Sequence, residues 1–129
     1  MAATGQRVLL VDDNADSTEP LSLLLQAKGH ETRVAVEGGQ AISVADDFQP
    51  TCVVLDLGLP GMDGSGVARR LRARPYGAQL TLVALTGWTG QEVRAKAAAA
   101  GFDYHLVKPV NWEELEHIVT AEGAQRRAR

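Results

Sequence analysis

Five short apolar runs recur along the chain, and each is followed by a longer stretch of mixed polarity. The runs read RVLLV, ETRVAV, TCVVL, TLVAL and YHLV, at positions 7–11, 31–36, 51–55, 81–85 and 104–107. Nearly continuous apolarity with β-branched residues is typical of strands buried on both faces of a parallel sheet. The pattern therefore predicts five parallel strands.

The stretches between these runs carry apolar residues at helical spacing and end at helix breakers. They predict helices at 17–28, 38–48, 64–73, 90–100 and 111–121. Gly29 and Gly101 each follow a predicted helix, as left-handed helix ends do, and Pro50 follows the second helix. The regular alternation of strand and helix predicts a doubly wound α/β domain with helices on both faces of the sheet.

Pro20 complicates the first predicted helix. A proline beyond the first turn removes a backbone donor and clashes with the carbonyl four residues earlier. We therefore expect the helix to begin late, near Glu19, with Ser17 or Thr18 as its cap and residues 14–17 as a loop. A mild kink at Pro20 is the alternative.

The composition is that of one globular domain. The chain has 129 residues, 45% of them hydrophobic and 22% charged. We predict a domain over residues 7–121, an N-terminal extension at 1–6, and a basic tail or cut linker at 122–129. The 16 acidic and 13 basic residues give a net charge of −3, and three arginines lie in the last four positions. Because no basic face is concentrated elsewhere, we expect no direct nucleic-acid binding.

The sequence also predicts a cellular compartment. Cys52 is the only cysteine and lies in an apolar run, so we expect a buried thiol and no internal disulfide. The N-terminus lacks the features of a signal peptide, and no apolar run approaches the roughly 18 residues that a membrane span needs. These features predict a cytoplasmic protein without membrane contact. His30, His105 and His117 do not have the spacing of metal ligands.

Acidic residues close two of the predicted strands. Asp12 and Asp13 follow the first strand, and Asp56 follows the third. The carboxyl ends of parallel strands meet at one edge of the sheet, where three carboxylates would repel one another. A divalent cation with oxygen ligands would relieve this repulsion, and Mg²⁺ fits it best. Helix capping is the simpler alternative, but it would explain one carboxylate rather than three.

Two further residues close strands at the same predicted edge. Thr86 follows the fourth strand, and Lys108 follows the fifth. A carboxylate such as that of Asp56 can attack phosphorus when a metal ion and a cationic side chain neutralise the charge that it approaches. Lys108 would pair with one phosphoryl oxygen, and the Thr86 hydroxyl would donate to another. Taken singly, Lys108 could form a surface salt bridge and Thr86 a cap, but their combination favours a phosphoryl site.

Four segments carry a resemblance to a known family. They read VDDN, LDLGLPGMDG, ALTG and AGFDYHLVKPV, in this order along the chain. From about Arg7 to Thr120 the sequence resembles the receiver domain of two-component response regulators. The resemblance implies a flavodoxin-like (βα)5 domain with strand order 2-1-3-4-5. It also implies that Asp56 accepts a phosphoryl group from the phosphohistidine of a sensor kinase or a histidine phosphotransfer protein.

The resemblance assigns roles to the other site residues. Asp13, Asp56 and the Gly58 carbonyl would ligate Mg²⁺, and Asp12 would hold the waters of the metal. The Lys108–Pro109 bond would be cis. The face formed by the fourth helix, fifth strand and fifth helix would change on phosphorylation and bind a downstream partner. Such a protein catalyses its own phosphotransfer and dephosphorylation rather than turning over a substrate.

Three positions modify this pattern. His105 occupies the place of a family Tyr or Phe that swings inward as the Thr86 hydroxyl is drawn to the phosphoryl group, which would make the switch sensitive to pH. A hydrogen-bonded surface histidine is the alternative. Gly58 and Trp88 each lie two residues after a site residue, beside the expected path of the hydrolytic water. Glycine leaves that path open and tryptophan shields it, so the lifetime of the phosphorylated state stays open.

Other classes fit the sequence less well. Phosphatases with an aspartate nucleophile carry it at the first strand with a second aspartate two residues on, where this chain has Gly58. A flavin-binding protein of similar fold would need a phosphate loop where DDNADST would repel phosphate. A degenerate receiver-like interaction module would keep the acidic, hydroxyl and lysine positions only by coincidence. The chain is either a stand-alone relay protein or the receiver of a hybrid sensor kinase, and AGFDYHLVKPV resembles receivers attached to such kinases.

Overall fold

Five parallel strands form the centre of the molecule in the computed structural model, which describes residues 5–58 and 63–128, with side chains up to position 121. The strands are β1 (Arg7–Val11), β2 (Glu31–Ala35), β3 (Cys52–Asp56), β4 (Thr81–Thr86) and β5 (Tyr104–Val107). They pair in the order β2-β1-β3-β4-β5. This order confirms the predicted doubly wound, flavodoxin-like α/β fold. Residues 59–62 of the segment LDLGLPGMDG lie outside the described residues.

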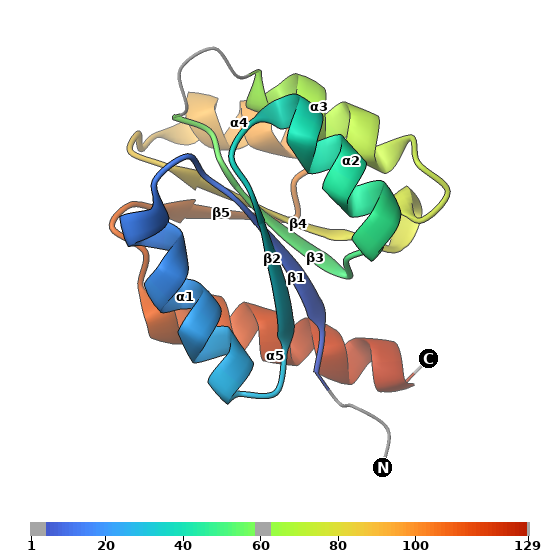
Figure 1. The fold of residues 1–129 in the computed structure, drawn as a ribbon. Helices are drawn as coiled ribbons and strands as arrows, with labels where there is room; N and C mark the ends of the chain where they lie inside the picture. The colour runs from blue at the N-terminus through green and yellow to red at the C-terminus, as the bar shows by residue number, and fades with distance from the viewer. Residues whose placement is uncertain (1–4, 59–62, 129) are drawn as a thin grey trace.

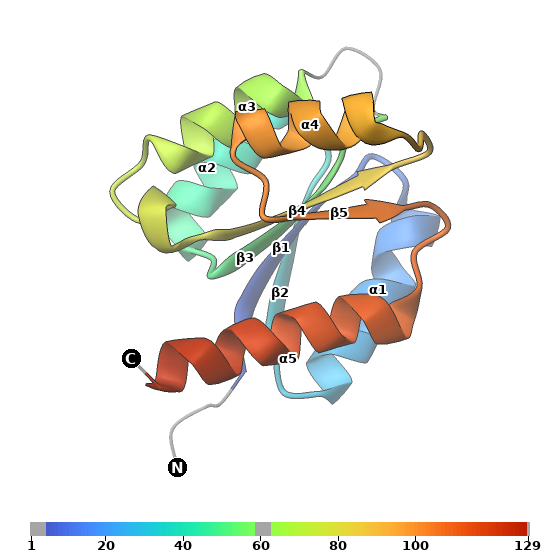
Figure 2. The ribbon, with the colours of Figure 1, turned by 180° about the vertical axis from the view of Figure 1, so that it is seen from behind.

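Helices cover both faces of this sheet. They are α1 (Ala15–Ala27), α2 (Gly38–Phe48), α3 (Gly64–Arg72), α4 (Gln91–Ala100) and α5 (Trp112–Ala128), and a short 3-10 turn, η1 (Gly77–Gln79), was not predicted. Figures 1 and 2 show α2, α3 and α4 on one face, and α1 and α5 on the other. Gly29 and Gly101 have φ values of 92° and 105°, which confirms the predicted left-handed helix ends.

Each face of the sheet has its own apolar core. The core beneath α2, α3 and α4 includes Leu71 and Ala97, and the core beneath α1 and α5 includes Leu25 and Leu115. The inner strands β1, β3 and β4 are almost wholly buried, and the Cys52 thiol is buried as predicted. The prediction of burial on both faces is wrong for β2, most of whose side chains are exposed or half-buried. As an edge strand, β2 has a strand partner on one side only.

The first helix begins earlier than predicted. α1 starts at Ala15 rather than near Glu19, so residues 15–17 are helical and not part of a loop. The Asn14 side chain accepts a hydrogen bond from the Asp16 backbone N–H at 2.9 Å, which satisfies one of the free donors at the helix start. Pro20 lies inside α1 on its exposed side, where water can solvate the carbonyl that loses its partner. Capping and burial of Leu25 therefore outweigh the missing backbone bond.

The last helix is longer than predicted. α5 continues to Ala128, through most of the segment 122–129 that was expected to be a tail or linker. This segment reads EGAQRRAR, and apart from one glycine its residues are good helix formers. Local propensity therefore favours continuation of the helix through this segment. Within the described residues, none of the helices combines the length and apolarity that would let it cross a membrane.

The residues just before β1 pack against the domain. Gln6 is buried: its backbone N–H donates to His30 Nδ1 at 2.9 Å, and its side-chain amide donates to the Val119 carbonyl at 2.6 Å. A Cβ on Gly5 would lie only 1.8 Å from the Gly29 carbonyl oxygen. A glycine is therefore required at position 5 for this close approach, which joins the start of the chain to the turn after α1.

Candidate functional site

The predicted site residues meet at the carboxyl edge of the sheet. Asp56 and Thr86 are the last residues of β3 and β4, and Asp12 and Lys108 directly follow β1 and β5. Backbone hydrogen bonds continue the pairing of the strands beyond their ends, from Leu57 N–H to the Leu85 carbonyl and from Lys108 N–H to the Thr86 carbonyl, both at 2.8 Å. The fold thus brings together residues that are far apart in the sequence.

Asp56 is a buried carboxylate with two defined partners. It is 3% exposed. Its Oδ1 accepts the Gly58 N–H at 2.8 Å, and its Oδ2 forms a close ion pair with Lys108 Nζ. A buried charge is costly unless it is paired and hydrogen-bonded, and both conditions are met here. The Lys108 side chain is 38% exposed, so it neutralises Asp56 from the open side of the site.

Asp12 lies beside this pair. Its side chain is buried and accepts the Asn14 backbone N–H at 3.0 Å. Burial raises the pKa of Asp12, the Asn14 hydrogen bond lowers it, and the charge of Asp56 raises it again, with smaller effects from Lys108 and Asp13. These effects show that the predicted carboxylates lie close enough to repel one another.

The donor atoms at this edge suit a hard cation. Within the described residues, no group of three or more His, Cys, Asp or Glu side chains has the arrangement of a metal site. Mg²⁺, however, keeps several waters and needs only one or two carboxylates from the protein. Burial and the neighbouring Asp56 charge both raise the pKa of Asp12, and such an ion would stabilise the charged form of this carboxylate. Asp13 and Gly58 are exposed at the same edge, so the residues present fit Mg²⁺.

Thr86 lies at the end of β4, next to the site, and His105 lies on the neighbouring strand β5 beside α4. Thr86 is buried, and its Oγ1 accepts the Trp88 backbone N–H at 3.1 Å, while the Trp88 side chain is 73% exposed. His105 lies opposite Ala84 of β4 and is partly buried. Both of its ring nitrogens are buried, and neither has a hydrogen-bond partner among the described residues. The alternative of a hydrogen-bonded surface histidine is therefore wrong.

A cleft of about 600 Å³ opens beside the site, between the start of α1 and the segment 108–110. Asp12 and Lys108 are among the polar residues that line it, and Pro20, Leu21 and Val110 contribute apolar surface. The peptide bond between Lys108 and Pro109, which borders this cleft, is cis.

Sequence reasoning missed two features here. Asn14 both holds Asp12 and caps α1, and the available signal was an asparagine directly before a helix that begins beside an acidic pair. The apolar wall of the cleft was missed because Leu21 and Val110 lie far apart in the sequence and become neighbours only in the fold.

Comparison with known proteins assigns the family. The response regulator receiver domain family matches residues 8–120, so the chain belongs to that family and is a receiver domain of two-component signalling. The chain is 37% identical over 116 residues to the DNA-binding response regulator MtrA of Mycolicibacterium paratuberculosis. The match covers 90% of this chain, which spans about half the length of MtrA.

Solved structures agree with this assignment. The chemotaxis response regulator CheY4 of Vibrio cholerae superimposes with a TM-score of 0.84 at 27% identity, covering 92% of this chain and 98% of CheY4. The receiver domain of a sensor histidine kinase from Pseudomonas aeruginosa superimposes with a TM-score of 0.81 at 29% identity, covering 93% of this chain and 98% of that domain. That structure is described with a magnesium ion coordinated in its active-site cleft.

Proposed function

We propose that this protein is the phosphoacceptor of a two-component system or phosphorelay, and that Asp56 is the residue phosphorylated. One carboxylate oxygen of Asp56 attacks the phosphorus of a phosphohistidine, the phosphorus–nitrogen bond breaks, and its electron pair stays on the imidazole. The observation that carries this proposal is the buried Asp56 carboxylate, oriented by the Gly58 N–H and paired with Lys108 beside Asp12.

The neighbouring residues would neutralise and orient the phosphoryl group. Lys108 leaves Asp56 Oδ2 and pairs with a phosphoryl oxygen, while the Thr86 hydroxyl donates to another. Asp13, Asp56 and the Gly58 carbonyl would hold Mg²⁺, and Asp12 would bind its waters. When bound, Mg²⁺ would neutralise the negative charge that otherwise repels an incoming phosphoryl group. Gly58 and Trp88 would tune hydrolysis by opening or shielding the path of water.

The signal would then pass to the face formed by α4, β5 and α5. Movement of the Thr86 hydroxyl toward the phosphoryl group would leave room for His105 to move inward. In its present position, neither ring nitrogen of His105 has a hydrogen-bond partner among the described residues. The domain, residues 7–121, would act in the cytoplasm without binding nucleic acid or membrane. Its donor would be a sensor histidine kinase or a histidine phosphotransfer protein, and the cleft beside Lys108 is large enough for an imidazole side chain.

The direct test is the intact mass of the protein after incubation with acetyl phosphate, with and without Mg²⁺. We expect wild type to gain one phosphoryl group only with Mg²⁺, and Asp56→Asn to gain none. Asp47→Asn is a matched control, because Asp47 is an exposed acid of α2 that pairs with Arg33.

Each outcome has a clear meaning. A phosphoryl group on the Asp56→Asn variant would show that a residue other than Asp56 accepts it. A wild type that gains nothing while it still binds Mg²⁺, with rapid hydrolysis excluded by a time course, would indicate a binding-only receiver-like module.

A further inference from the structure

The two ends of α4 are held very differently. The buried residues of α4, Ala97 and Ala100, both lie in its C-terminal half, whereas residues 91–96 are exposed or half-buried. The N-terminal end follows Gly90, and among the described residues no side chain caps it. This weakly held end is connected to Thr86 through the exposed segment 87–90.

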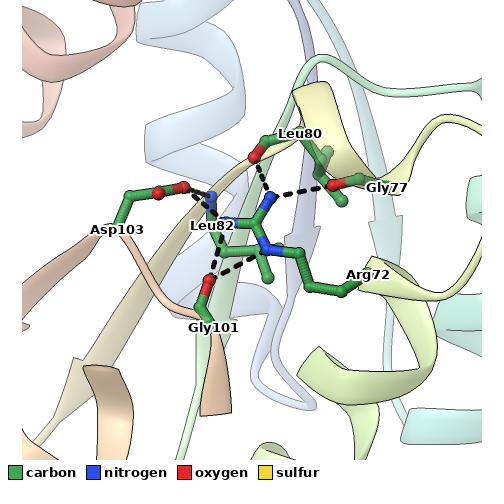
Figure 3. Close-up of polar contacts among 6 residues, drawn as sticks. All are labelled: Arg72, Gly77, Leu80, Leu82, Gly101 and Asp103. Carbon is green, nitrogen blue, oxygen red and sulfur yellow. Dashed lines mark hydrogen bonds and ion pairs between the residues drawn. The ribbon is translucent and has the colours of Figure 1, made fainter. Parts of the chain in front are cut away.

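Arg72 holds the opposite end of α4. From the end of α3, its guanidinium makes five hydrogen bonds, which reach three backbone carbonyls and one carboxylate (Figure 3). The Gly101 carbonyl, at the C-terminal cap of α4, accepts from Nε at 3.0 Å and from Nη2 at 2.6 Å. The other carbonyls belong to Gly77 and Leu80, before β4. Arg72 therefore ties the end of α4 to the start of β4.

Asp103 completes this anchor. Its Oδ2 pairs with Arg72 Nη2 at 2.7 Å and also accepts the Leu82 N–H at 2.8 Å (Figure 3). Its own backbone N–H donates to the Leu82 carbonyl at 2.8 Å. The connection between α4 and β5 is thus fixed to β4 by main-chain and side-chain bonds together.

Gly101 packs directly on the arginine. A Cβ at this position would lie 3.1 Å from Arg72 Cγ, and the φ of 105° is unfavourable for any other residue. The C-terminal end of α4 therefore has little freedom to move past α3.

We propose that Arg72 is a positioning residue for the response to phosphorylation, an inference that rests on the proposed function. Because Arg72 fixes Gly101 and Asp103, the C-terminal end of α4 stays in place and acts as a pivot. The conformational change that starts at Thr86 on phosphorylation is therefore confined to residues 87–96. Segments held by few buried contacts open more readily than segments held by charge-assisted hydrogen bonds, so the two halves of α4 differ in the cost of moving.

Hydrogen exchange of the full chain, followed by mass spectrometry, tests this proposal. We would compare wild type with Arg72→Gln, each before and after phosphorylation by acetyl phosphate with Mg²⁺. In wild type, we expect phosphorylation to change the rate of amide hydrogen exchange by roughly tenfold in residues 87–96, and by less than about twofold in residues 98–103. In Arg72→Gln, we expect the change to extend through 98–103, with phosphoryl uptake retained.

Arg74→Gln is the matched control. Arg74 lies two residues further along the chain, but pairs with Asp46 of α2 and not with α4. We expect Arg74→Gln to behave as wild type. A purely structural role for Arg72 would raise exchange before and after phosphorylation alike, leaving the ratio between the two states in 98–103 unchanged.

Three results would overturn the proposal. The pivot would be rejected, and the proposed function kept, if phosphorylation of wild type changed hydrogen exchange equally in residues 87–96 and 98–103. The same conclusion would follow if the change in Arg72→Gln stayed within residues 87–96. Absence of a phosphoryl group on wild type, read from intact mass with rapid hydrolysis excluded by a time course, would reject the proposed function and this inference with it. If Arg72→Gln does not fold, Asp103→Asn weakens the same anchor while keeping the bonds of Arg72 to the carbonyls, and the same criteria apply.

Discussion

Among the ion pairs of the described residues, the pair of Lys108 is the one whose acidic partner is buried. Its partner, Asp56, is a buried carboxylate that lies close to a second one, Asp12. The pair of Lys28 with Glu116, by contrast, has an N–O distance of 3.8 Å and a largely exposed lysine. Exposed ion pairs contribute little to stability, whereas an unpaired buried charge is strongly unfavourable.

We therefore predict that Lys108→Met lowers the free energy of unfolding by about 1–3 kcal/mol, since it leaves the Asp56 carboxylate buried without a cation. Urea denaturation without Mg²⁺ measures this loss. Lys28→Met, the matched control, should cost less than about 1 kcal/mol. Equal losses in the two variants would mean that Lys108 does not stabilise the site carboxylates. If Mg²⁺ binds as proposed, it should restore part of the stability of Lys108→Met.

At the scale of single elements, α1 depends on one residue before its start. Asn14 accepts a backbone hydrogen bond from Asp16 through its side chain and donates its own N–H to Asp12. The cap therefore fixes both the helix and a carboxylate of the site. It also explains why Pro20 inside the helix did not move the start of α1 to Glu19.

For this reason we predict that Asn14→Ala lowers the free energy of unfolding by about 0.5–2 kcal/mol, because the Asp16 N–H loses its acceptor. Asn14→Ser keeps an acceptor at the same place and should recover most of this loss. Thermal or urea unfolding followed by circular dichroism compares the three proteins. An alanine variant as stable as wild type would show that water caps α1 equally well.

At the scale of the whole molecule, Gln6 and His30 join the start of β1, the turn after α1, and α5. His30 Nδ1 accepts the Gln6 backbone N–H, and the Gln6 side chain donates to the Val119 carbonyl. Burial lowers the pKa of His30, and the charge of Glu116 partly opposes this shift. Protonation of Nδ1 would remove the acceptor on which this junction depends.

We predict that the stability of the protein depends on pH through His30. With a folded pKa below the unfolded value of about 6.5, the unfolded chain binds more protons in the interval between the two. The contribution of neutral His30 is therefore complete above about pH 6.5 and is lost as the pH falls through the folded pKa.

Urea denaturation between pH 5 and pH 8 measures this dependence in wild type and in His30→Gln. The carboxylates titrate in both proteins, so the difference between the two curves isolates His30. We expect the advantage of wild type over the variant to shrink as the pH falls. A difference that stays constant over this range would contradict the prediction.

Much of the fold could be predicted because its signals are local. Short, mostly apolar runs predicted the positions of all five strands, and helix 38–48 was predicted with the bounds that the structure has. The failures came where one local rule competes with another or with packing. Pro20 argued for a late helix start that the Asn14 cap overrides. β2 was expected to be buried on both faces, but it reads ETRVA and lies at the edge of the sheet, where most of its side chains are exposed or half-buried.

The sequence alone determined that Asp12, Asp56, Thr86 and Lys108 each close an apolar strand, because strand polarity and the residue that follows it are properties of the chain. Only the tertiary structure decided what those side chains contact. Strand order and register bring Lys108 into an ion pair with Asp56. They also bring Asp12 close enough to Asp56 for the Asp56 charge to raise the pKa of Asp12, in addition to the effect of burial. The bonds of Arg72 to the end of α4 were invisible in the sequence, because a guanidinium that binds backbone carbonyls leaves no pattern in the residue types that it contacts.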